Sequence, residues 1–129
     1  MNQEISKLIN QGNIIKLIPP SMEDAQNFDK LIPFPDQNGI QYIKASTILF
    51  LKSESNYTHV YFTDDRKLLL SKTLKVVNGY LPSSIFVRIH KSYVINKEHV
   101  VALRKNTAHL VGNVAIPLSR SFDKTLIIT

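Results

Sequence analysis

The sequence predicts a mostly β fold, built from short antiparallel strands in small sheets with one or two short helices. Runs rich in apolar and β-branched residues recur from Leu31 to the C-terminus. Residues that favour turns separate these runs, and only one stretch changes clearly to helical spacing. Short strands with a single convincing helix are typical of a sheet or sandwich and not of a fold that alternates strands with helices.

The expected strands follow one another closely along the chain. They are Leu31–Phe34, Ile40–Ile43, Thr47–Leu51, Tyr57–Phe62, Lys67–Leu70, Ile85–Ile89, Val101–Lys105, Thr107–Val111 and Val114–Leu118. Turn formers fill Pro35–Gly39, Asn106 closes a hairpin, and Gly112-Asn113 makes a further turn. Thr63–Arg66 lies between two strand-like runs and is a strong hairpin signal.

Ser71–Leu81 is the stretch with helical spacing. Leu74, Val77, Tyr80 and Leu81 recur on one helix face, Thr73 is the expected N-cap, and Pro82 stops the helix. Two later segments stay open. Ser92–Val100 is ambiguous and has room for one helical turn, and Phe122–Ile128 is a short helix or a strand.

Residues 1–29 are expected to be a lead-in or linker and residues 30–129 the domain itself, because 129 residues suit one compact domain. Gln3–Ile9 has the spacing of a short helix, and Pro19-Pro20 then interrupts regular structure. The lead-in is either a linker from something upstream or a strand and loop packed on the edge of the domain.

The composition narrows the class of protein. A hydrophobic fraction of 43% supports a real core. No apolar run approaches the ~20 residues of a membrane-spanning helix, and the N-terminus lacks the plan of a secretory signal. The absence of cysteine excludes disulfides and thiolate zinc sites and suits a reducing compartment, so we expect a cytoplasmic protein.

Positive charge is concentrated in the later part of the chain. Residues 1–39 carry three Lys against five Asp or Glu, a net charge of −2, whereas residues 40–129 carry 13 Lys or Arg against five acids, a net charge of +8. A basic domain of this kind favours a polyanionic partner, either nucleic acid or an anionic membrane face.

The sequence gives little support to catalysis or to a metal or cofactor. The four histidines (His59, His90, His99 and His109) lack the spacing of a metal motif. Asp64-Asp65 lies in the predicted hairpin turn, where Asp serves local hydrogen bonding. There is no glycine-rich phosphate loop and no nucleophile elbow. We therefore expect no enzyme activity.

Phe86–Asn96 is the most informative stretch. In a strand, Phe86, Arg88 and His90 would point one way and Val87 and Ile89 the other. Arg88 and His90 either contact DNA or, as the structural alternative, hydrogen-bond neighbouring backbone at the end of the sheet. Lys91 and Ser92, at an expected turn, are either DNA contacts or simply solvated, and their side chains suit phosphate oxygens and guanine edges.

The same stretch, Phe-x-Arg-x-His-Lys-Ser-Tyr-x-x-Asn, resembles the signature of LytTR DNA-binding domains, which occur in many bacterial response regulators. Three further segments agree with that family in order and spacing. They are Ile48–Thr58, Leu70–Leu74 and Ile116–Arg120, the last with the element Ile-Pro-x-Ser-Arg. The resemblance covers about residues 30–129.

The resemblance implies an elongated arrangement of three small sheets that grips duplex DNA with loops at one edge. The contact segments would be Ser53–Tyr57, extending to His59, then Lys91 with Ser92, then Ser119 with Arg120. Each has a structural alternative: Asn56 as a turn former, Tyr57 as an aromatic at the core edge, and Arg120 as a solvated side chain. The expected DNA-binding residues are Asn56, Tyr57, His59, Lys91, Ser92, Ser119 and Arg120.

We therefore expect sequence-specific binding to promoter DNA, as the output module of a bacterial two-component system. The resemblance implies paired direct repeats with one domain per repeat, a weak or DNA-dependent dimer, and no cofactor. Such domains usually follow a receiver domain or a membrane segment, for which residues 1–29 are too short, so the chain is either an excised output domain or a stand-alone regulator. Two other classes stay open: a protein-interaction module that sequesters a regulator, and a small β enzyme or ligand-binding barrel.

Overall fold

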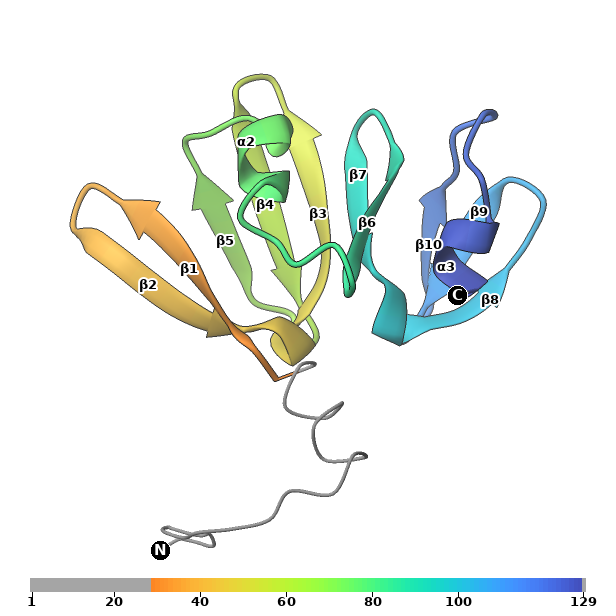
Figure 1. The fold of residues 1–129 in the computed structure, drawn as a ribbon, viewed down its shortest axis with the longest axis horizontal. Coiled ribbons are helices and arrows are strands. Elements are labelled where there is room, and N and C mark those ends of the chain that lie inside the picture. The colour runs from red at the N-terminus through yellow and green to blue at the C-terminus, as the bar shows by residue number, and fades with distance from the viewer. Residues whose placement is uncertain (1–28, 129) are drawn as a thin grey trace, which may run out of the picture.

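A computed structural model describes residues 29–128, and these form three small antiparallel sheets with two short α-helices. This confirms the predicted fold class. The two-stranded sheet pairs β1 (Leu31–Asp36) with β2 (Gly39–Lys44). The central sheet has the order β5-β4-β3-β7-β6, and the third sheet the order β10-β9-β8. Figure 1 shows the three sheets following one another along the long axis of the molecule.

The remaining elements have the following bounds. The central sheet contains β3 (Ile48–Glu54), β4 (Tyr57–Phe62), β5 (Lys67–Leu70), β6 (Phe86–His90) and β7 (Tyr93–Asn96). The third sheet contains β8 (Val100–Leu103), β9 (Thr107–Leu110) and β10 (Val114–Pro117). The helices are α2 (Leu74–Asn78) and α3 (Thr125–Ile128), with single 3-10 turns at Ala45–Thr47 and Lys97–His99.

The central sheet separates two apolar cores, because alternate residues of a strand face opposite sides. On β6, Phe86 packs into the first core and Ile89 into the second, as the alternation predicts. The first core also takes Ile32 and Phe34 from β1 and side chains from α2. The second core is closed by the third sheet, through Ala108, Leu110 and Ile116.

Local turn chemistry places several elements as expected. The hydroxyl of Thr73 accepts a hydrogen bond from the Val76 N–H and caps α2. In the β4–β5 turn, Asp64 accepts from the backbone N–H and the Nε of Arg66, and Asp65 has a φ of 70°. Desolvation raises the pKa of Asp64, but the hydrogen bonds and charge of Arg66 outweigh it and hold the pKa below its usual value. The structural interpretation of Asp64-Asp65 is therefore confirmed.

Some predicted bounds were wrong. The α2 helix ends at Asn78, earlier than Leu81, because Tyr80 and Leu81 continue in a tighter i→i+3 turn. The β1–β2 turn is only Gln37-Asn38, since Pro33 and Pro35 are accommodated within β1 of a two-stranded sheet, where every strand is an edge strand. The two open segments are now assigned: Ser92–Val100 contains β7 and one 3-10 turn, and Phe122–Ile128 contains the helix α3, which ends the described residues.

The buried side chain of Asn96 explains why that 3-10 turn follows β7 directly. Its Oδ1 accepts a hydrogen bond from the Glu98 N–H at 2.9 Å. Its Nδ2 donates to the carbonyls of Ala45 (3.2 Å) and Ile48 (3.0 Å), at the start of β3. Asn96 thus caps one turn and fastens it to another.

The expected helix over Gln3–Ile9 lies outside the described residues, so the lead-in over residues 1–29 stays a prediction. Among residues 29–128, no helix is long and apolar enough to cross a membrane.

Candidate nucleic-acid interface

The three expected contact segments lie at one edge of the molecule, the upper edge in Figure 1. Ser55-Asn56 forms the turn between β3 and β4, and Lys91-Ser92 the turn between β6 and β7. The third segment follows the end of β10. Two backbone hydrogen bonds join the segments: Ser53 N–H donates to the Ser92 carbonyl at 2.9 Å, and Ser119 N–H donates to the Ile89 carbonyl at 2.8 Å.

A β-bulge accounts for the second of these bonds. The pairing of β6 with β7 shifts between Arg88 and His90, so Ile89 has no partner residue on β7. The extra residue of a bulge leaves the ladder locally unpaired. The Ile89 carbonyl accepts from Ser119 instead, while its side chain stays 1% exposed in the second core. The irregularity therefore attaches the third contact segment to the central sheet.

The side chains of Arg88 and His90 hold the turn that presents Lys91 and Ser92. Arg88 donates from Nη2 to the Lys91 carbonyl at 2.5 Å and, more weakly, from Nε to the His90 carbonyl at 3.4 Å. The Nδ1 of His90 accepts from the Ser92 N–H at 3.0 Å. The structural alternative for these two residues is thus confirmed. Lys91 is exposed and Ser92 half-buried.

The β3–β4 hairpin presents Asn56 and Tyr57 to solvent. Asn56 is exposed, and Tyr57 is 46% exposed, so both side chains are accessible to an external partner. Ser55 has a φ of 55°, which is uncommon for a residue with a side chain and is found at tight turns and functional sites. Further down, Phe50 stacks on Tyr61 across the hairpin, with ring centroids 4.4 Å apart, and this stiffens the pair of strands.

His59 lies within β4 and not in the turn. Its Nε2 is 2.5 Å from Oε1 of Glu54, on the neighbouring strand, and the imidazole is half-buried. Because one ring nitrogen is occupied by a carboxylate, His59 is placed to support the hairpin. Its expected contact with DNA stays a prediction.

Ser119 and Arg120 follow Pro117, the last residue of β10. Leu118 N–H donates to the Asn106 carbonyl at 2.9 Å, so consecutive residues 118 and 119 are both fixed through their backbone. The Ser119 hydroxyl lies 3.2 Å from that of Ser121. Arg120 is exposed, and its guanidinium has no acidic partner among the described residues. Because the backbone next to Arg120 is fixed and its guanidinium is unpaired, the side chain is suited to donate hydrogen bonds to an acceptor on another molecule.

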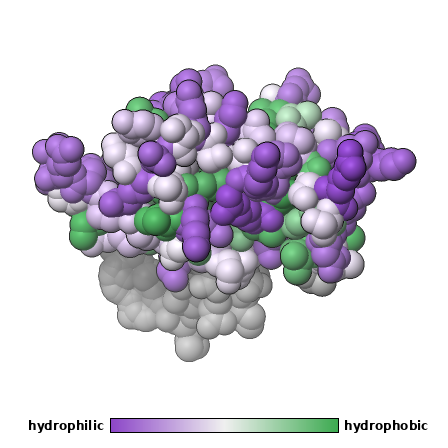
Figure 2. All heavy atoms as spheres, turned by 90° about the horizontal axis from the view of Figure 1, so that it is seen from above, coloured by the Kyte–Doolittle hydropathy of each residue, from purple (hydrophilic) through white to green (hydrophobic). Residues whose placement is uncertain are grey.

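The edge is rich in unpaired positive charge. Figure 2 looks down on it and shows hydrophilic side chains standing out along its whole length, with smaller apolar areas between them. Within residues 29–128 there are two ion pairs, Arg66 with Asp64 and His59 with Glu54, and neither involves Lys91 or Arg120. Lys91 and Arg120 therefore keep their charge available to a polyanion.

Sequence reasoning missed Lys105 and Lys124, which lie with Arg120 around a cleft at the end of this edge. Lys105 belongs to the β8–β9 turn and Lys124 to the segment before α3. Only the tertiary pairing of these two segments brings the lysines together, so no local pattern in the sequence could have indicated the cleft.

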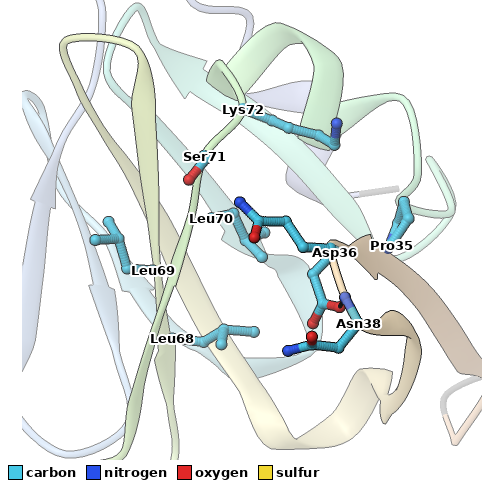
Figure 3. A pocket seen from close by; sticks show the side chains of 9 residues that line it. Pro35, Asp36, Asn38, Leu68, Leu69, Leu70, Ser71 and Lys72 are labelled. Atoms are coloured by element: carbon cyan, nitrogen blue, oxygen red, sulfur yellow. Dashed lines mark hydrogen bonds between the residues drawn. The ribbon is translucent and has the colours of Figure 1, made fainter.

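A second cavity, of about 560 Å³, lies between the β1–β2 turn and β5 (Figure 3). Leu68 and Leu70 point toward it and Leu69 away from it. The carboxylate of Asp36 accepts from the Asn38 N–H at 2.7 Å and so serves its own turn. No cluster of three metal-ligating side chains occurs among the described residues. Polar residues of the turn and of the segment after β5 line the cavity beside these leucines, so its lining is partly polar and partly apolar.

A mostly β scaffold that carries bonded turns with exposed, unpaired cations along one edge belongs to the class of domains suited to a polyanionic partner such as nucleic acid. Residues 38–127 match the family described as LytTr DNA-binding domain, and the chain belongs to this family. The resemblance found in the sequence is thereby confirmed.

Individual relatives agree with this. The chain is 30% identical over 92 residues to the sensory transduction protein LytT of Bacillus subtilis, covering 67% of this chain and 38% of that protein. It is 27% identical over 106 residues to the transcriptional regulatory protein LytR of Staphylococcus aureus, covering 76% and 42%. It thus spans less than half the length of these relatives.

The fold agrees with that of a LytTr DNA-binding domain from Bacillus cereus whose structure has been solved. The TM-score is 0.61 at 18% identity, over 76% of this chain and 96% of that one. At this identity the likeness concerns the fold alone.

Proposed function

We propose that this domain binds duplex promoter DNA in a sequence-specific way and regulates transcription as the output module of a bacterial signalling system. The observation that carries the proposal is the joining of three turn segments, through the Ser53–Ser92 and Ser119–Ile89 backbone bonds, into one basic edge. The family supports the DNA partner, and the names of the relatives support a regulatory role, for which we expect a cytoplasmic location.

In this proposal some side chains of the edge contact DNA phosphates and others contact bases. Exposed lysines position the edge on phosphate oxygens, which carry no sequence information. Asn56, Lys91 and Arg120 reach base edges, where an Asn can bond adenine bidentately and an Arg or Lys can bond guanine O6 and N7. Tyr57, Ser92 and Ser119 line the same edge and complete the contact. His59 supports the first turn. No step requires a cofactor or a catalytic group.

The DNA site in this proposal is a pair of direct repeats, and one domain binds each repeat. Such a site suits a domain that dimerises weakly or only on DNA. In a longer protein, an upstream receiver domain would bring the phosphorylation signal. Both ideas come from the family resemblance.

Arg120→Lys tests the assignment of a base reader. The variant keeps the positive charge but loses the fork that bonds guanine bidentately. We expect it to keep most of its non-specific binding and to lose ~1–3 kcal/mol of preference at one base pair of the preferred site. The assay is competition at fixed salt between the preferred duplex and its single-base variants.

The matched control is Arg66→Lys, since Arg66 lies in the β4–β5 turn at the opposite end of the strands and pairs with Asp64. This control should rank the variant duplexes as the parent does. If Arg120→Lys also ranks them as the parent does, Arg120 is a phosphate contact and not a base reader.

A further inference from the structure

The cleft beside Arg120 is formed by two loops that are distant in the sequence. It is open, with a volume of about 580 Å³. The β8–β9 turn contributes Lys105 and Asn106, and the segment after β10 contributes Ser119, Arg120, Phe122 and Lys124. The backbone bond from Leu118 N–H to the Asn106 carbonyl, at 2.9 Å, holds the two loops together. The cleft is therefore built by the fold and is not an accident of long side chains.

Three cations line this cleft, and no acidic side chain lines it. None of Lys105, Arg120 and Lys124 has an ion pair with another described residue. The acid nearest in sequence is Asp123, whose carboxylate accepts from the hydroxyl of Thr125 at 2.6 Å and from its N–H at 3.0 Å. Like charges gathered without a counter-ion repel one another, and an anion in the cleft would relieve that repulsion.

The charge of the lining suits a phosphodiester, whose oxygens accept hydrogen bonds from charged donors. Two ammonium groups are strongly hydrated point charges on flexible stems, and they suit the phosphate oxygens. Arg120 stands between this cleft and the rest of the basic edge, because Ser119 is bonded to the central sheet at Ile89. A phosphate held by the two lysines would fix the distance from Arg120 to the neighbouring base.

We propose that Lys105 and Lys124 form a clamp for one phosphate of the DNA backbone, and that this clamp positions Arg120 for reading a base. The inference rests on the proposed function and extends the interface to the β8–β9 turn, which none of the three contact segments includes. The clamp would contribute to the affinity for DNA and fix the position of the domain along the duplex, whereas Arg120 would determine which base is preferred.

The test uses Lys105→Gln, Lys124→Gln and the double variant in the full chain. Gln removes the charge and keeps the first two methylenes of the stem and a polar end, so packing near the backbone is preserved. Lys44→Gln is the matched control, since Lys44 is an exposed lysine at the end of β2, away from the edge. Dissociation constants for the preferred duplex are measured between 50 and 200 mM salt, and thermal midpoints confirm folding.

If both lysines share one phosphate, the double variant should reduce the magnitude of the slope of log affinity against log salt by about 0.9. Each single variant should reduce it by less than this, because the remaining lysine still neutralises the phosphate. The ranking of single-base variants of the site should not change. Lys44→Gln should match the parent in slope and ranking. A duplex with one neutral methylphosphonate at the clamped position should weaken parent binding and weaken the double variant no further.

An unchanged slope in the double variant, with a parent that binds DNA, overturns the clamp and leaves the proposed function standing. A double variant that loses about 1.8 in slope assigns the lysines to two phosphates and overturns the shared site. A changed ranking makes the lysines base readers and also overturns it. A parent that does not bind duplex DNA overturns the clamp and the proposed function together.

Discussion

Replacing Asn96 by Ala tests how the basic edge is supported, because the buried amide makes three hydrogen bonds at the far ends of β3 and β7. Each is worth about 1 kcal/mol net, and leaving a buried acceptor unpaired costs ~1–3 kcal/mol. The carbonyls of Ala45 and Ile48 belong to residues that are fully buried, whereas Glu98 is exposed and its N–H can bond water. Asn96→Ala should therefore lower the free energy of unfolding by about 3–5 kcal/mol.

Urea denaturation followed by circular dichroism measures this change. For a domain of this size, 3 kcal/mol corresponds to a fall of roughly 12–24 °C in the thermal midpoint. Asn96→Asp is the control. It keeps the acceptor for the Glu98 N–H but, while ionised, offers no donor to the two carbonyls, so it should be at least as destabilised at neutral pH and partly recover when acid protonates the carboxyl. A loss below about 1 kcal/mol in Asn96→Ala would refute the reasoning, since one hydrogen bond alone would account for it.

Two further predictions concern binding and folding separately. If about four phosphates are neutralised, log affinity should fall with log salt at a slope of about −3.6, roughly a hundredfold loss between 50 and 200 mM; a flat titration would contradict the electrostatic account. Lys91→Ala and Arg120→Ala should weaken specific binding and leave the thermal midpoint nearly unchanged, because both side chains are exposed. Phe86→Ala should instead cost about 3–5 kcal/mol of stability, since Phe86 is 3% exposed in the first core. Destabilisation by Arg120→Ala as large as that by Phe86→Ala would remove Arg120 from the binding edge.

Elements set by local chemistry could be predicted from the sequence. The Thr73 cap, the Thr63–Arg66 turn and the alternation of Phe86 and Ile89 depend on residues a few positions apart. The ends of the elements were harder to predict from the sequence. After Asn78 the helix changes to i→i+3 hydrogen bonds, and this change depends on the burial of Leu81 in the first core, which is a tertiary contact.

The candidate site could be predicted from the sequence only through the family resemblance. The bonds Ser53–Ser92 and Ser119–Ile89 join segments that no local pattern relates. The bulge at Ile89 also has no signal in the sequence, and neither has the meeting of Lys105 with Lys124. Conversely, the structural role of Arg88 and His90 followed from their place at a strand end.

Selection of bound sequences from a random duplex pool tests the central claim most directly. The full chain and its Arg120→Ala variant would be taken through the same rounds at fixed salt, and the enriched sequences compared. The account predicts a defined motif with the parent and loss of information at one or more positions with the variant. A parent pool that stays as random as the starting pool, at a salt concentration where the protein binds DNA, would contradict sequence-specific recognition by this edge.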